Sequence, residues 1–207
     1  MRVIIEIIII VAIAFFSTAI NAQETQRKQG GNFVIIDTTG NLPLELPDYY
    51  TGKDIISGAG FSFKKILESA NYLKIGNINN VKFDMNPVKS TYAGEEPFRY
   101  IWALARFNDK NQIYSSIRDV LGTTIINQFK LSHNSATIGI KFIVNMDGTV
   151  PEVEFLLLKN ALLFSISPEK LYQLESLLKQ RVTFTVDQRS MLDFITGVNI
   201  SVTIKDL

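Results

Sequence analysis

The chain has 207 residues, 46% of them hydrophobic, and its 21 basic and 20 acidic residues leave a formal net charge of +1. This balance, with no basic cluster along the sequence, argues against nucleic-acid binding, which needs grouped Lys and Arg to neutralise phosphates. The absence of cysteine excludes disulfides, thiolate metal sites, cysteine nucleophiles and lipid attachment through an N-terminal cysteine.

The N-terminus has the three-part layout of a secretory signal peptide. A short positive start is followed by an apolar run over residues 7–16, and small residues then lead to Ala22. We expect cleavage after Ala22, so that residues 1–22 are a signal peptide, with cleavage after Ala19 as the second choice. The alternative is an uncleaved anchor, but a spanning helix needs about 20 apolar residues, and even the longer stretch over residues 3–20 is broken by Glu6, Ser17 and Thr18.

A secreted chain without disulfides fits a bacterial envelope better than an animal extracellular space. No later segment is apolar enough to span a membrane. The sequence therefore predicts a periplasmic or secreted protein of a Gram-negative envelope, with no transmembrane segment in the mature chain. Residues 23–32 are polar, and we expect them to be a flexible leader.

Residues 33–110 are expected to form an N-terminal α+β region, whose role the sequence does not reveal. Residues 33–36 indicate a short strand. Apolar residues recur at helical spacing over residues 62–73 and predict a helix there. Alternation over residues 81–85 predicts a strand. Residues 98–107 fit either a helix or a buried strand, and both interpretations stay open.

Two helices are predicted in the C-terminal half. Asp109 is expected to cap the first helix, and Gly122 to weaken or end it. Ser167 is expected to cap the second, with Pro168 in its first turn. Their apolar faces carry Ile113, Ile117, Val120 and Leu121 in the first helix, and Leu171, Leu174, Leu177 and Leu178 in the second.

Strands are predicted between and after these helices. Alternating apolar residues indicate strands over residues 138–144 and 153–157, and the Asp147-Gly148 pair between them is typical of a hairpin turn. Residues 182–186 are expected to be extended. A last strand carries Val198, Ile200, Val202 and Ile204 on its core side. This order predicts an α+β fold with an antiparallel sheet packed on helices.

Residues 136–150 combine a strand, an Asp-Gly turn and the start of a second strand, and residues 167–180 and 197–205 add a helix and a last strand. In this respect residues 111–207 resemble the periplasmic C-terminal domain of the TonB family. The family's Pro-rich spacer is missing, as is the Tyr-Pro pair that precedes its first strand. The resemblance therefore implies a stand-alone envelope protein that keeps the domain shape, rather than energy transduction to outer-membrane transporters.

The sequence contains no convincing catalytic constellation. His133 is the single histidine, which excludes a site with two histidine ligands, and its polar neighbours favour a solvated loop. Gly58 and Gly60 precede the first predicted helix and form a weak candidate anion site. Residues 37–40 resemble the Asp-Thr-Gly triplet of aspartic proteases only superficially, because an extra threonine breaks the motif.

Carboxylates occur in two pairs that deserve separate interpretations. Glu95 and Glu96 with Arg99 are a candidate acid pair with an orienting cation, although a solvated helix start is the simpler interpretation. Glu152 and Glu154 are expected on the solvent side of one strand, where they promote solubility.

Aromatic residues suggest one further kind of site. Trp102 lies among apolar neighbours and is expected in the core rather than at a sugar-binding surface. Tyr49 and Tyr50 follow Pro47, and such a pair can stack on glycans or peptides, although covering the edge of a core is its commoner use.

The favoured hypothesis is a non-enzymatic protein-binding domain that captures an envelope protein or extended peptide by strand addition at its C-terminal edge strand. The candidate partner-binding residues are Asn199, Ser201 and Thr203, and no cofactor or metal is expected. Two alternatives stay open. A secreted hydrolase of glycans or peptides needs a carboxylate pair in a cleft, and a carbohydrate- or lipid-binding envelope module needs an exposed aromatic shelf.

Overall fold

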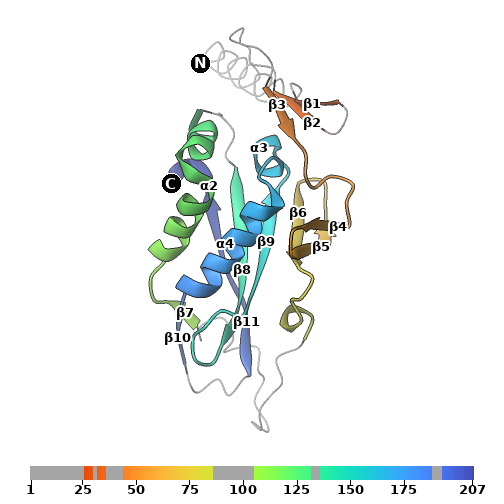
Figure 1. The fold of residues 1–207 in the computed structure, drawn as a ribbon. Helices are drawn as coiled ribbons and strands as arrows, with labels where there is room; N and C mark the ends of the chain where they lie inside the picture. The colour runs from red at the N-terminus through yellow and green to blue at the C-terminus, as the bar shows by residue number, and fades with distance from the viewer. Residues whose placement is uncertain (1–25, 30–31, 36–43, 86–104, 132–135, 188–192) are drawn as a thin grey trace, which may run out of the picture. The chain divides into compact units, whose positions relative to one another are not determined.

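The computed structural model describes residues 26–29, 32–35, 44–85, 105–131, 136–187 and 193–207 (Figure 1). The chain divides into two compact units, Met1–Asp48 and Tyr49–Leu207. The signal peptide predicted for residues 1–22 lies outside the described residues.

The first unit contains a small antiparallel sheet of three strands, in the order β1-β2-β3. The second strand confirms the one expected at residues 33–36. The first strand lies within the stretch that the sequence predicts to be a flexible leader. In the structure its backbone pairs with β2. The strands are β1 (Gln26–Gln29), β2 (Asn32–Ile35) and β3 (Leu44–Pro47).

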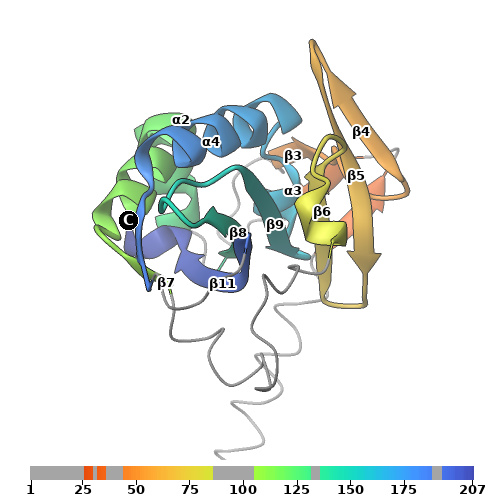
Figure 2. The ribbon, with the colours of Figure 1, turned by 90° about the horizontal axis from the view of Figure 1, so that it is seen from below.

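The second unit has an α+β fold, as predicted, in which helices pack on one antiparallel sheet of six strands. Figure 2 shows both long helices, α2 (Asn111–Leu131) and α4 (Pro168–Arg181), on the same face of the sheet. We call this face the helix face, and the opposite one the outer face. In sheet order the strands are β11 (Phe194–Thr203), β8 (Thr137–Asn145), β9 (Glu152–Leu158), β6 (Tyr72–Asn77), β5 (Phe61–Glu68) and β4 (Ile55–Gly58).

The central hairpin of β8 and β9 is confirmed in the register that the alternation predicts. Ile138 pairs with Leu157, and Phe142 with Val153. In the turn, the N–H of Gly148 donates to the carbonyl of Asn145 over 2.9 Å. Gly148 has a φ of 84°, a conformation that a residue with a side chain adopts only under strain.

Both predicted helices are confirmed, together with the residues that start them. Asp109 Oδ1 accepts the N–H of Asn111 at the start of α2, and Ser167 caps α4 by accepting the N–H of Lys170. Gly122 interrupts α2 with a φ of 75°, after which the helix resumes. Within the described ranges, no helix is both long enough and apolar enough to cross a membrane.

The apolar faces of these helices meet the helix face of the sheet to form the core. Fully buried side chains come from both layers, and α4 contacts both β9 and β4. The buried residues include Ile113, Ile117, Leu171, Leu174 and Leu178 of the helices and Ile138, Ile140, Phe142, Val153, Phe155 and Leu157 of the strands.

The helix predicted over residues 62–73 is wrong, because this stretch forms strands β5 and β6. A register shift between Lys65 and Leu67 marks a bulge in β5. The extra residue breaks the two-residue alternation along β5, so the apolar residues Phe63, Ile66 and Leu67 imitate helical spacing. Ser69 then closes the turn, accepting backbone N–H groups from Asn71 and Tyr72.

The strand predicted over residues 81–85 is also wrong, and a short 3₁₀ turn, η1 (Lys82–Asp84), stands in its place. Three consecutive N–H groups of this turn donate to the carboxylate of Glu152, on β9. The partner is distant in the sequence, so the local pattern carries no sign of it.

Pairing between β6 and β9 joins the two halves of the second unit. Strands from both sides of the boundary expected between residues 110 and 111 therefore belong to one continuous sheet. Of residues 98–107, only the last three are described, and they form a strand, β7 (Ala105–Phe107). This strand pairs with β10 (Phe184–Val186), which confirms the extended segment predicted at residues 182–186.

Candidate functional site

The last strand of the chain, β11, lies at one edge of the six-stranded sheet. On one side it pairs with β8 from Phe194 to Thr203. On its other side, none of the strands in the described part of the chain pairs with it. The strand carries neither a charged residue nor a proline, whereas native proteins commonly use such residues to protect a free edge from pairing.

The direction of each backbone group in β11 follows from one hydrogen bond just past its end. The N–H of Ile204 donates to the carbonyl of Ala136 over 2.9 Å, in register with the ladder to β8. Residues of an antiparallel pair alternate between those that exchange backbone hydrogen bonds and those that do not. The residues that turn toward β8 are Val198, Ile200 and Val202. The residues that turn their N–H and C=O groups toward the free side are Asn199, Ser201 and Thr203.

The three candidate partner-binding residues therefore share one edge and one face. Asn199 and Ser201 are exposed, and Thr203 is half-buried. The Asn199 amide donates to the carbonyl of Gly197 over 3.1 Å, and the Thr203 hydroxyl lies 3.4 Å from that of Thr137 on β8. Their side chains lie on the outer face of the sheet, as do the side chains of the β8 residues that pair with them.

The burial of the side chains on the core side of β11 differs from the prediction. Val202 and Ile204 are buried, whereas Val198 and Ile200 are only half-buried. Ile204 belongs to a 3₁₀ turn, η5 (Ile204–Asp206), that contacts α2 rather than continuing the strand. Near the start of the strand, a bulge between Ile195 and Val198 shifts the register, so the regular edge runs over residues 198–203.

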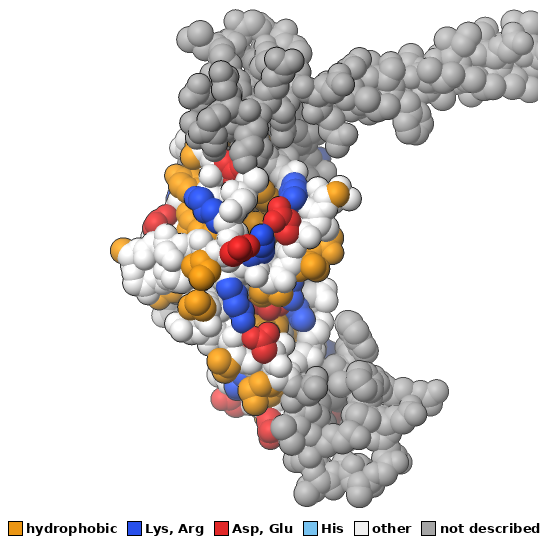
Figure 3. All heavy atoms as spheres, turned by 90° about the vertical axis from the view of Figure 1, so that its right-hand side faces the viewer, with side chains coloured by type: hydrophobic (Ala, Val, Ile, Leu, Met, Phe, Trp, Pro, Cys, Tyr) orange, Lys and Arg blue, Asp and Glu red, His pale blue; other side chains and the backbone are white. Residues whose placement is uncertain are grey.

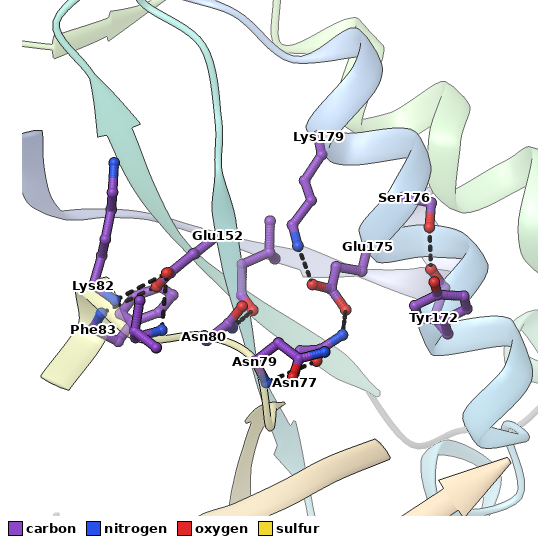
Figure 4. Close-up of polar contacts among 12 residues, drawn as sticks. Asn77, Asn79, Asn80, Lys82, Phe83, Glu152, Tyr172, Glu175, Ser176 and Lys179 are labelled. Carbon is purple, nitrogen blue, oxygen red and sulfur yellow. Dashed lines mark hydrogen bonds and ion pairs between the residues drawn. The ribbon is translucent and has the colours of Figure 1, made fainter. Parts of the chain in front are cut away.

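The two carboxylates predicted on a solvent-facing strand surface are buried, which corrects that expectation. Glu152 is 6% exposed, and its oxygens accept the N–H groups of η1 over 2.9 to 3.1 Å (Figure 4). Glu154 is 3% exposed and pairs with Lys74 over 2.6 Å. Because both carboxylates have partners inside the protein, the geometry gives them a structural role.

Sequence reasoning missed a third buried carboxylate. Glu175 of α4 is 1% exposed, accepts the side-chain amide of Asn77 over 3.1 Å and pairs with Lys179 (Figure 4). Nearby, the amide of Asn80 donates to the carbonyl of Val153 over 2.8 Å, beyond the point where β6 ends. The only local signal was the run of asparagines at the end of β6.

A small charge cluster lies on the outer face beside the candidate edge. Lys141 pairs in register with Asn199 on one side and with Glu154 on the other. Its Nζ is 5.2 Å from the centre of the Phe83 ring. Burial lowers the pKa of Lys141, repulsion from Lys74 lowers it further, and attraction to Glu154 partly offsets both.

The side of the unit over β4, β5 and β6 carries basic and acidic residues interspersed rather than grouped by sign (Figure 3). Lys65 pairs with Asp54 over 2.7 Å and with Glu68 over 3.2 Å, and Lys159 also pairs with Glu68 over 2.9 Å. Exposed apolar side chains such as Leu67 lie among them. On such a mixed surface, neighbouring charges of opposite sign offset one another, which does not favour the attraction of a charged ligand.

The aromatic and glycine residues considered as candidate sites have structural roles instead. Tyr50 is 1% exposed, its hydroxyl donates to the carbonyl of Ile166 over 2.7 Å, and its burial raises its pKa. The exposed shelf with Tyr49 that a glycan-binding module needs is therefore not formed. Gly58 and Gly60 lie at the hairpin between β4 and β5, so no helix follows them and the weak candidate for an anion site lacks the helix it requires.

The remaining candidates, His133, residues 37–40, Glu95, Glu96, Arg99 and Trp102, lie outside the described residues. In the described part of the chain, no group of three or more His, Asp or Glu side chains is arranged to hold a metal ion.

Comparisons with known proteins add information about the fold. None of the protein-family models matches the chain, and neither does any curated protein sequence. A crystal structure of a DUF5043 family protein from Bacteroides uniformis is similar, with a TM-score of 0.58 and 13% sequence identity. The likeness covers 75% of this chain and 87% of that chain. At this identity the likeness concerns the fold alone.

Proposed function

We propose that this chain is a non-enzymatic protein-binding domain of the bacterial cell envelope, which captures an extended segment of a partner protein by strand addition to β11. The observation that carries the proposal is the edge of β11 that no described strand covers, where Asn199, Ser201 and Thr203 turn their backbone groups away from the sheet. An extended peptide pairs with such groups through its main chain, and that pairing supplies most of the affinity.

The proposed location rests on the sequence. The apolar run before Ala22, followed at once by polar residues, supports secretion into the periplasm or beyond. The lack of cysteine agrees with a bacterial envelope. The order of helices and strands over residues 111–207 is the one on which the resemblance to the TonB family C-terminal domain rests, and it supports a binding role without requiring energy transduction.

Neither alternative function gains support from the described residues. A hydrolase needs carboxylates free to exchange protons with a substrate. Glu152 and Glu175 are instead engaged with protein groups. A carbohydrate-binding module needs exposed aromatic faces, and Tyr50 is buried.

The test uses proline to remove one outward N–H from the edge. Ser201→Pro deletes a donor that does not take part in the ladder to β8, and proline is tolerated in such edge positions. Ser201→Ala is the matched control, because it removes the hydroxyl and keeps the N–H. Tagged wild type, Ser201→Pro and Ser201→Ala are used for affinity capture from envelope extract, after urea denaturation has verified that all three fold.

We expect Ser201→Ala to retain the proteins captured by the wild type, and Ser201→Pro to lose them. Identical sets of captured proteins for all three would contradict strand addition at this edge. Turnover of glycans or peptides by the purified protein would contradict a purely binding role.

A further inference from the structure

The free edge of β11 presents different chemistry on the two faces of the sheet. On the helix face it carries Val198, Ile200 and Val202, which pair in register with Phe142, Ile140 and Ile138 of β8. On the outer face it carries the small polar side chains of Asn199, Ser201 and Thr203. An added strand therefore meets an apolar row on one side and a polar row on the other.

The apolar row is incompletely covered, and the uncovered part lies at the edge. Ile140 and Phe142 on β8 are 1% and 0% exposed, whereas Ile200 and Val198 beside them are half-buried. In the interior of the sheet, each such side chain has apolar neighbours on both flanking strands. The side on which Val198 and Ile200 lack a described strand is the side that a bound strand would occupy.

Backbone pairing fixes which residues of an added strand reach each face. In an antiparallel pair, directly opposite residues have their side chains on the same face. The outward backbone groups belong to Asn199, Ser201 and Thr203, whose side chains lie on the outer face. The residues that bond to them consequently place their own side chains on the outer face, and the residues between them lie beside Val198 and Ile200.

We infer that this edge selects an antiparallel segment in which apolar residues alternate with small polar ones. This inference rests on the strand addition proposed above. The polar residues form the backbone bonds to β11, and the apolar residues extend the core row on the helix face. A charged side chain beside Val198 or Ile200 loses its hydration without gaining a partner on that face of β11. Segments with charged residues at those alternate positions are therefore excluded.

The test measures peptide binding by fluorescence anisotropy with the full chain. The probe is a labelled peptide of the pattern Thr-Val-Ser-Ile-Asn-Val-Thr, kept soluble by a polyethylene glycol tail. A second peptide has the same composition with its apolar residues contiguous. Two further versions of the alternating peptide carry N-methyl groups, one on the polar residues and the other on the apolar residues.

We expect the alternating peptide to bind at least about tenfold more tightly than the contiguous one, since the loss of a few backbone bonds or apolar contacts has this effect. N-methylation of the polar residues should abolish binding, because it blocks the N–H groups that face β11. N-methylation of the apolar residues should leave binding within about threefold, because those N–H groups face away.

Other outcomes overturn the inference in distinguishable ways. Equal binding of the alternating and contiguous peptides, lost for both in Ser201→Pro, would refute the selectivity and leave strand addition intact. The opposite N-methylation pattern would refute the antiparallel register alone. Self-association that Ser201→Pro abolishes would place a second copy of this chain on the edge instead of the peptide. If no peptide binds and Ser201→Pro captures the same proteins as the wild type, both the inference and the proposed function fail.

Discussion

Gly148 lies where the turn between β8 and β9 meets β10. Both its backbone conformation and the lack of room for a side chain require glycine there. Its φ is 84°, and a Cβ at this position would lie 2.0 Å from the carbonyl oxygen of Phe184. We expect Gly148→Ala to lower the free energy of unfolding by at least about 2 kcal/mol, because backbone strain adds to a clash with main-chain atoms. Urea denaturation measures the loss.

Gly52 provides a matched control for this substitution. It also has a positive φ, of 74°, but a Cβ there meets nothing within 4 Å. Gly52→Ala should therefore show the strain alone, at about 1 kcal/mol. Equal losses for the two variants would mean that the contact with β10 contributes nothing.

Glu152 anchors η1 to the outer face of the sheet. Glu152→Ala leaves the N–H groups of Val81, Lys82 and Phe83 without their acceptor, and we expect a loss of at least about 2 kcal/mol. Glu152→Gln keeps one acceptor oxygen and should fall between this variant and the wild type. Both are measured by chemical denaturation.

Asp84 is the control, because it is a neighbouring acid whose ion pair with Lys64 is largely exposed. Asp84→Ala should change stability by no more than about 0.5 kcal/mol. A loss for Glu152→Ala as small as this would contradict the anchoring role.

Asp147 makes the β8–β9 turn sensitive to acid. Its Oδ1 accepts the hydroxyl of Thr149 over 2.6 Å and the N–H of Thr149 over 2.9 Å, and these two bonds lower its pKa below the usual 3.8. A carboxyl with a lowered pKa in the folded state stabilises the fold above its unfolded pKa and loses that effect as the pH falls through the folded pKa. Asp147→Ala should thus be less stable than wild type at neutral pH, and the difference should shrink as the pH falls through the lowered pKa.

Nuclear magnetic resonance titration of the carboxyl carbon gives the pKa directly. Thr149→Val removes the hydroxyl donor and should move the pKa of Asp147 back toward 3.8. No movement in that variant would show that the hydroxyl of Thr149 does not set the pKa.

Strand β11 and the turn η5 that follows it offer a comparison of one chemical change in two environments. Ile204 is 0% exposed, whereas Ile200 is half-buried at the edge. We expect Ile204→Ala to lower the free energy of unfolding by about 2 to 5 kcal/mol, the range for a buried isoleucine. Ile200→Ala should lower it by clearly less, because less apolar surface leaves the water when that side chain folds. Equal losses would mean that the edge is covered in the folded protein.

Elements that the sequence predicts correctly are those whose determinants are local. Asp147 and Gly148 specify the central turn, and Ser167 with Pro168 specifies the start of α4. The failures have non-local causes. The bulge in β5 breaks the alternation, and η1 depends on Glu152, far away in the sequence. Alternation likewise predicts a common face for Asn199, Ser201 and Thr203, but the direction of their amides depends on pairing with β8.

Cleavage of the proposed signal peptide would shorten the whole molecule, and one measurement tests it. We expect the mature chain to begin at Gln23, or at Ile20 if the peptidase uses the second site, because the apolar run ends in small residues before Ala22. Mass spectrometry of the N-terminal peptide from an envelope fraction reads the first residue. An intact Met1 in that fraction would contradict cleavage.

The pairing of β6 with β9 also governs how the molecule can assemble. During synthesis, β4, β5 and β6 are the first strands of this sheet to be made, and the edge of β6 stays uncovered until the distant β9 follows. Contacts between segments so far apart slow folding, and an uncovered strand edge can recruit other chains in the meantime. A fragment spanning residues 111–207 would lack β6 permanently and leave β9 open. We therefore expect such a fragment to form aggregates in the cell, and in the full chain we expect the uncovered edge of β6 to need a chaperone, or rapid export, until β9 has been made.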